Sequence, residues 1–89
     1  MEQTFTEKVI NIKQHTSICR TTNYCEPLIT SENFNYIIFV AENKAVNKCI
    51  SICEILKRKY RFLKEDGDLG VSDNGVEPKV VIKLYKEKQ

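Results

Sequence analysis

The feature that most constrains the fold of this chain is a short apolar run joined almost without a loop to a long amphipathic segment. Residues 37–41 read Ile-Ile-Phe-Val-Ala, and an uninterrupted apolar run of this length predicts a buried strand. Apolar residues at helical spacing follow at once and predict a helix over residues 44–60. A strand that passes directly into a helix favours a fold in which helices pack against a sheet.

Alternating apolar and polar residues predict strands near both ends of the chain. Ile10 and Ile12 alternate with polar neighbours and predict a strand over residues 8–13, and residues 79–86 alternate in the same way. The predicted order of elements is strand, helix, strand, helix, strand, strand. This order indicates an α/β two-layer sandwich.

The first helix is predicted over residues 17–31, where apolar residues recur at helical spacing. Thr16 or Ser17 can supply the N-cap. Pro27 lacks an N–H group, and its ring meets the carbonyl four residues earlier. We therefore expect a kink or an early end of this helix near residues 25–26.

The chain is predicted to form a single domain over residues 1–89. Residues 1–6 are expected to be a frayed leader. All three glycines lie together with several acidic residues between residues 65 and 78, which predicts a mobile hairpin loop.

The overall charge does not by itself direct the protein to nucleic acid. The formal net charge is +2, because 14 basic residues are offset by 12 acidic residues. Any nucleic-acid binding must therefore come from how the charges are distributed. No N-terminal apolar segment or membrane-spanning run is present in the sequence, so we expect a cytoplasmic or nuclear protein with no membrane partner.

Two lysines open the predicted second helix. Lys44 and Lys48 are four residues apart, which places both ammonium groups on one face beside the N–H groups of the first turn. Such a surface suits a phosphate backbone. Lysines are also common on solvated helix faces, so the spacing alone leaves the ordinary surface interpretation open.

The same segment resembles the Alba family of small nucleic-acid-binding proteins. The resemblance lies in Asn-Lys-Ala-Val-Asn-Lys over residues 43–48 and in Glu-Ile-Leu-Lys-Arg over residues 54–58. The second motif is similar to the eukaryotic branch, which includes small Alba-like subunits of ribonuclease P and MRP. The resemblance implies a four-stranded mixed sheet packed on two helices, and low-specificity binding of DNA or RNA.

The resemblance also implies which residues contact nucleic acid. The family's glycine before the basic residue is Asn43 here, and asparagine is the next best residue for a positive φ and a good helix N-cap. Lysines and one arginine would contact phosphates, and two asparagines would donate or accept hydrogen bonds at the backbone or base edges. The six predicted residues are Lys13, Arg20, Asn43, Lys44, Asn47 and Lys48.

The predicted second helix is too apolar to show only one face to a small sheet. We therefore expect a homodimer, or a heterodimer with a related Alba-like chain, with Ile52 and Ile55 at the interface. The acidic residues between 65 and 77 would repel phosphate. They support an alternative function, a heterodimerising assembly subunit of an RNA–protein complex such as ribonuclease P or MRP.

The sequence offers no support for catalysis. His15 is the only histidine, and no nucleophile motif or glycine-rich phosphate loop is present. The four cysteines are expected to pack as small hydrophobic residues: Cys19, Cys25, Cys49 and Cys53. We therefore expect no enzymatic activity, no metal, no cofactor and no small-molecule substrate.

Overall fold

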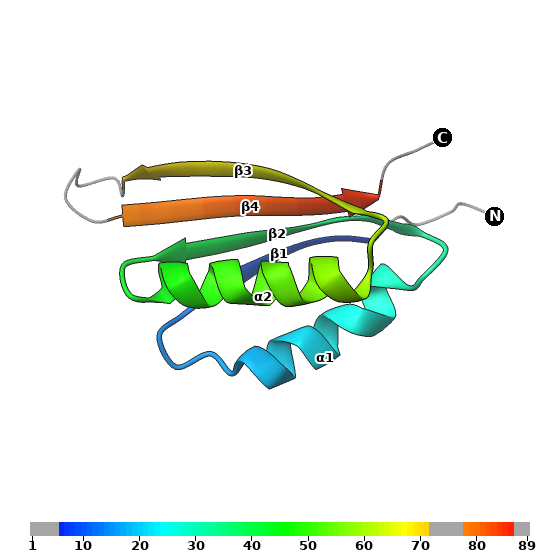
Figure 1. The fold of residues 1–89 in the computed structure, drawn as a ribbon, viewed down its shortest axis with the longest axis horizontal. Coiled ribbons are helices and arrows are strands. Elements are labelled where there is room, and N and C mark those ends of the chain that lie inside the picture. The colour runs from blue at the N-terminus through cyan, green and yellow to red at the C-terminus, as the bar shows by residue number, and fades with distance from the viewer. Residues whose placement is uncertain (1–5, 72–77, 87–89) are drawn as a thin grey trace.

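The computed structural model describes residues 6–71 and 78–86. Its elements follow the chain in the order β1 (Thr6–Ile12), α1 (Ile18–Ile29), β2 (Phe34–Glu42), α2 (Ala45–Lys59), β3 (Leu63–Val71) and β4 (Pro78–Lys86) (Figure 1). The strands form one sheet in the order β1-β2-β4-β3, in which β1 and β2 are parallel and the other neighbours are antiparallel. Both helices lie on the same face of this sheet (Figure 1). The predicted two-layer α/β sandwich with a mixed sheet is confirmed.

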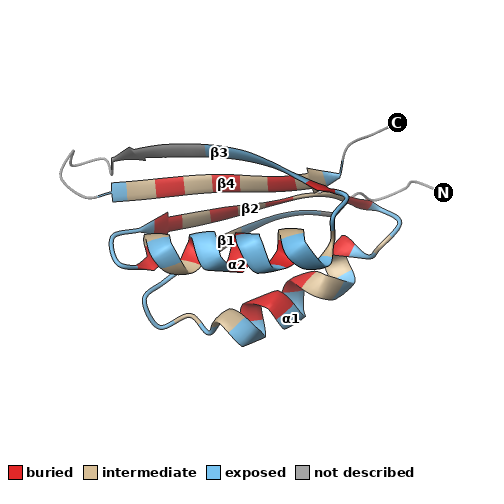
Figure 2. Ribbon diagram, viewed as in Figure 1, coloured by how far each residue is buried: buried red, intermediate tan, exposed pale blue. Residues whose placement is uncertain are grey.

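The core lies between the sheet and the helices. Alternate residues of β2 and β4 are buried, and the fully buried Ile37 and Leu84 are direct partners across these two strands (Figure 2). Ile52 and Leu56 of α2 are also fully buried against this surface. The apolar residues at helical spacing and those that alternate along the strands thus form the two sides of one core.

The first helix is longer than Pro27 predicted. Ser17 caps its N-terminus as expected, since its side-chain oxygen accepts a hydrogen bond from the backbone N–H of Arg20. The helix does not end near residues 25–26 but continues to Ile29, so the prediction of an early end was wrong. Pro27 lies in the last turn, and Ile29 is 2% exposed, which anchors that turn in the core.

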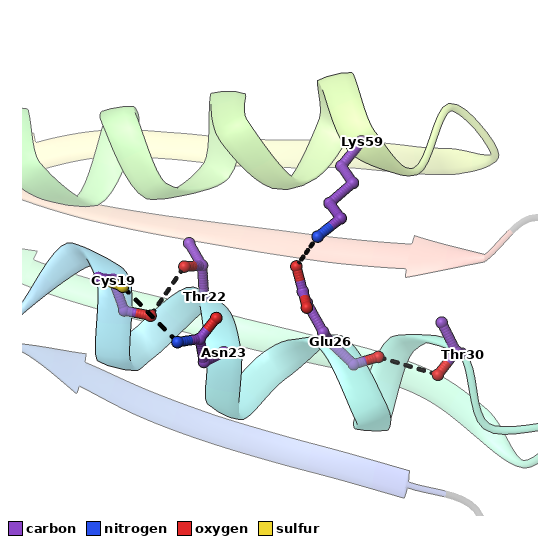
Figure 3. Close-up of polar contacts among 6 residues, drawn as sticks. All are labelled: Cys19, Thr22, Asn23, Glu26, Thr30 and Lys59. Carbon is purple, nitrogen blue, oxygen red and sulfur yellow. Dashed lines mark hydrogen bonds and ion pairs between the residues drawn. The ribbon is translucent and has the colours of Figure 1, made fainter.

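Thr30 adds two hydrogen bonds that secure the end of α1. Its backbone N–H donates to Glu26 O at 3.1 Å, and its hydroxyl donates to the same carbonyl at 3.0 Å (Figure 3). The Glu26 side chain forms an ion pair with Lys59 at the end of α2 (Figure 3). This pair joins the two helices. Lys57, also in the last turn of α2, forms an ion pair with Glu65 of β3, so both lysines make structural contacts.

The structure corrects half of the predicted dimer interface. Ile52 is 0% exposed and belongs to the core of this chain, so no partner chain can reach it. Ile55 is 42% exposed, and Ile50 is 39% exposed on the opposite flank of the helix. The apolar residues of α2 are therefore divided between the core of this chain and two exposed flanks of the helix.

The predicted mobile loop over residues 65–78 was wrong for residues 65–71, which belong to β3, and for Pro78, which begins β4. Each of residues 65–71 has a partner on β4, and Gly67 lies opposite Ile82. Pairing with a neighbouring strand outweighs the low strand propensity of glycine and aspartate. Residues 72–77 lie outside the described residues. Of the predicted leader, residues 1–5 also lie outside them, and Thr6 begins β1.

Neither helix in the described part of the chain has the length and apolar character required to cross a membrane.

Candidate nucleic-acid interface

The two strand-to-helix turns with the predicted basic residues lie at the same end of the sheet. β1 and β2 are parallel neighbours, so their carboxyl ends meet at one edge, from which the chain enters α1 and α2 (Figure 1). An open cleft of about 930 Å³ lies at this edge. It is lined by Asn11, Ile12, Lys13, Gln14, Val40, Ala41, Glu42, Asn43, Lys44 and Ala45.

The turn from β2 into α2 requires a residue with positive φ. Asn43 has a φ of 56°, which confirms that asparagine here adopts the left-handed conformation that glycine would adopt most readily. Its backbone N–H donates to Pro78 O at 2.9 Å, which ties the turn to the start of β4. The N-cap of α2, however, is Lys44 rather than Asn43.

Lys44, the N-cap residue of α2, makes no side-chain capping hydrogen bond. The N–H groups of a first helical turn point out of the helix N-terminus and carry its partial positive charge. Lys44 is exposed and lines the cleft beside them. A phosphate placed here would meet backbone donors and an ammonium group together.

Lys48 joins the two turns. Its Nζ donates a hydrogen bond of 2.6 Å to the backbone O of Gln14, in the turn between β1 and α1. An ammonium group has three donors, so this bond leaves capacity for a further contact. Lys48 therefore holds the first turn against α2 and brings a positive charge to the rim of the cleft.

The turn after β1 is itself ordered by hydrogen bonds. The backbone N–H of Lys13 donates to the Thr16 hydroxyl at 2.8 Å, and the Thr16 N–H donates to Lys13 O at 3.0 Å. These bonds fix the position of the Lys13 backbone, while the residue itself is exposed and lines the cleft.

The predicted residues thus fall into two groups. Lys13, Asn43 and Lys44 line the cleft, with Lys48 bonded to its edge. Arg20 and Asn47 lie in the first turns of α1 and α2, and both are exposed but do not line it.

Sequence reasoning missed two charged residues at this edge. Glu42 ends β2 and lines the cleft, and its cross-strand partner on β4 is Lys79. The Glu42 carboxylate lowers the positive potential of the cleft. Glu42 was visible in the sequence as the neighbour of Asn43, but the approach of Lys79 depends on the pairing of β2 with β4.

No protein-family model matches the sequence, and no curated protein matches it. Among solved structures, the fold is similar to that of ALBA1 from Trypanosoma brucei, with a TM-score of 0.67 and 16% sequence identity over 90% of this chain and 70% of that one. It is also similar to Alba from Thermoplasma volcanium, with a TM-score of 0.62 and 17% identity over 88% of this chain and 99% of that one. This chain has the Alba fold.

Within the Alba fold, the motif over residues 43–48 forms the turn and first helical residues at the cleft. The first of the two motifs that carry the resemblance therefore lies at the cleft, whereas residues 54–58 lie at the other end of α2. Asn43 departs from the family's glycine, but it adopts the left-handed conformation that the turn requires.

The cysteines of this Alba fold pack as hydrophobic groups, with one exception. Cys25, Cys49 and Cys53 are at most 1% exposed, whereas Cys19 is exposed, so the prediction of a core role was wrong for Cys19. Burial raises the pKa of the Cys25 thiol to about 11. A hydrogen bond with Cys49, together with burial, raises the pKa of Cys53. Thiols held protonated in this way are poor metal ligands, and the residues described here contain no cluster of three potential metal ligands.

Proposed function

We propose that this chain is an Alba-type nucleic-acid-binding protein that grips the phosphate backbone of DNA or RNA at the cleft. The observation that carries the proposal is the convergence of Lys13, Lys44 and Lys48 at the cleft beside the N-terminus of α2. This arrangement brings ammonium groups and backbone N–H donors together at one site.

The proposed contacts predict low sequence specificity. Contacts to phosphate position a nucleic acid but do not identify its bases. Arg20 and Asn47 are exposed on the helical turns that flank the cleft, where they would extend the contact along the backbone. Glu42 opposes this charge, so binding should be moderate and strongly dependent on salt.

The proposal is tested by measuring the affinity of the chain for an arbitrary duplex by fluorescence anisotropy at several salt concentrations. Three lysine contacts predict a slope of log affinity against log salt of about −2.7 on duplex DNA, at about 0.9 per contact. Replacing Lys44 and Lys48 with glutamate should remove most of the affinity and reduce the slope by about 2.

The matched control is Lys8→Glu, which makes the same charge reversal at an exposed position near the other end of β1. This variant should retain nearly all of the affinity. Equal losses in Lys8→Glu and Lys44→Glu would show that only overall charge matters, and a flat salt dependence would refute the phosphate cleft.

The apolar flank of α2 beside β3 favours a second candidate function. In this alternative the chain is a heterodimerising assembly subunit, such as those of ribonuclease P or MRP. β3 is an edge strand, and a groove of about 320 Å³ lies between it and α2, with the 39% exposed Ile50 in its wall. Gly67 contributes no side chain to this groove. A related Alba-like chain would cover the apolar surface at Ile50.

Sedimentation of the isolated chain distinguishes a homodimer from a chain that pairs only with a related partner. A self-associating chain sediments as a dimer, and Ile50→Asp should then yield a monomer that remains folded. A chain that needs a related partner sediments as a monomer before any substitution.

A further inference from the structure

The face of the sheet opposite the helices is open. Both helices pack on the other face, and no helix in the described part of the chain covers this one (Figure 1). Ile37 and Leu84 point into the core, so their neighbours in sequence point to the open face. Val9 on this face is 62% exposed.

Two tyrosines lie side by side on the open face. Tyr36 of β2 and Tyr85 of β4 are direct cross-strand partners on the two central strands, and both are partly exposed. Lys83 lies on the same face of β4, two residues before Tyr85. Its Nζ is 4.8 Å from the Tyr36 ring centroid and 5.7 Å from the Tyr85 ring centroid. The two central strands therefore carry a pair of aromatic rings with a cation over them, near the end of the sheet where β2 begins and β4 ends.

We propose that this face binds the unpaired bases of a single-stranded nucleic acid, which stack on Tyr36 and Tyr85. The inference rests on the proposed nucleic-acid function and adds a second contact surface, selective for single strands. Aromatic residues on the central strands of an open sheet are a general solution for stacking bases, because every base presents a π face. The bases of a duplex are already stacked on each other and cannot reach the rings.

A base that stacks on the rings must replace the ammonium group of Lys83, and this replacement is favourable. The contact between an exposed ammonium group and a ring changes an equilibrium constant by about two- to fivefold. Stacking of one base on an aromatic side chain corresponds to about 5- to 150-fold. A base therefore displaces the ammonium group, which remains close enough to meet the adjoining phosphate.

The charges beside the tyrosines indicate where the backbone of the strand would lie. Lys64 of β3 is the cross-strand partner of Tyr85. On the other side, Glu7 of β1 is the partner of Tyr36, and its carboxylate accepts a hydrogen bond of 2.7 Å from Asn35. Asp66 of β3 lies opposite Lys83 and offsets part of this positive charge. Phosphates would therefore keep to Lys64 and Lys83, away from Glu7 and Asp66.

The same charges argue against a protein sheet as the occupant. Lys83 lies on a central strand directly opposite Asp66 of β3. Packing a second sheet on this face would remove both charges from water, which is costly in the absence of compensating partners. A single strand covers the rings and leaves the charged groups solvated.

Three ligands of equal length test the inference: a thymidine dodecamer, an abasic strand with the same phosphates, and a duplex dodecamer. The unmodified chain should bind the thymidine strand at least tenfold more tightly than the abasic strand. Tyrosine fluorescence should be quenched by the thymidine strand alone. Equal affinity for the thymidine and abasic strands would overturn the stacking proposal.

The decisive variant is Tyr36→Leu with Tyr85→Leu, which should lose about tenfold or more in affinity for the thymidine strand and nothing for the abasic strand or the duplex. Tyr36→Phe with Tyr85→Phe keeps the rings, so it should keep the affinity and lose the fluorescence quench. The matched control is Tyr24→Leu, because Tyr24 is 53% exposed on α1 and should not matter.

The outcomes separate this inference from the proposed cleft. If the double variant Lys44→Glu with Lys48→Glu loses binding to the abasic strand and the duplex, the proposed cleft is supported, independently of the results for the tyrosine variants. If the paired leucine variant folds, as judged by circular dichroism, and still binds the thymidine strand like the parent, only the stacking inference is overturned. If the unmodified chain binds none of the three ligands at low salt, both proposals are overturned.

Discussion

Truncating Ile52 to alanine should destabilise the chain far more than the same change at Ile55, three residues further along α2. Ile52 is 0% exposed, so Ile52→Ala removes three fully buried carbon atoms, worth about 2.4 kcal/mol of transfer free energy at about 0.8 kcal/mol each. The cavity adds to this loss, and comparable substitutions cost about 2–5 kcal/mol in total.

Ile55 provides the matched comparison within one helix. Its side chain is 42% exposed, so Ile55→Ala should reduce the free energy of unfolding by only about 1 kcal/mol and leave no enclosed cavity. For a domain of this size, each kcal/mol lowers the melting temperature by about 4–8 °C. The two variants should therefore differ by roughly 5–30 °C.

Urea unfolding followed by circular dichroism, at two protein concentrations, measures both losses. A loss at Ile52 that does not depend on protein concentration supports its place in the core of a single chain. Similar losses at the two positions would refute this reasoning, as would an Ile52→Ala variant that dissociates an oligomer without losing stability as a monomer.

Two further predictions follow from the turn before α2 and from the buried thiols. Because Asn43 has a positive φ, Asn43→Val should be about 1–2 kcal/mol less stable than Asn43→Gly, measured by thermal unfolding. Equal stability of these two variants would show that the turn does not need a left-handed residue. Burial raises the pKa of Cys25 to about 11, so the folded state favours the neutral thiol. The stability that this thiol contributes is complete below about pH 8.5, the ordinary thiol pKa, and is lost as the pH rises toward the folded value. Urea titrations between these pH values should show a steeper decline for the parent than for Cys25→Ala, and parallel declines would contradict the assignment.

The sequence determined the layers of this fold through its periodicities. The alternation in residues 8–13 and 79–86, and the helical spacing of residues 44–60, survive in the structure as β1, β4 and α2. The identity of the lysine-bearing turns was also local information, since Lys13, Asn43 and Lys44 follow directly on strand ends. Positive φ at Asn43 was anticipated from the resemblance, in which a glycine stands at this position and asparagine is the next best residue for this conformation.

Tertiary structure decided what depends on partners distant in the chain. Pairing with β4 made a strand of residues 65–71, whose local composition predicted a loop. Burial of Ile29 in the core carried α1 past Pro27. The direction in which Ile52 and Ile55 point was invisible to a pattern that records only apolar character, because a helix this apolar has no unique inward face. The meeting of Tyr36 with Tyr85, 49 residues later, required the register of two central strands, which no local segment specifies.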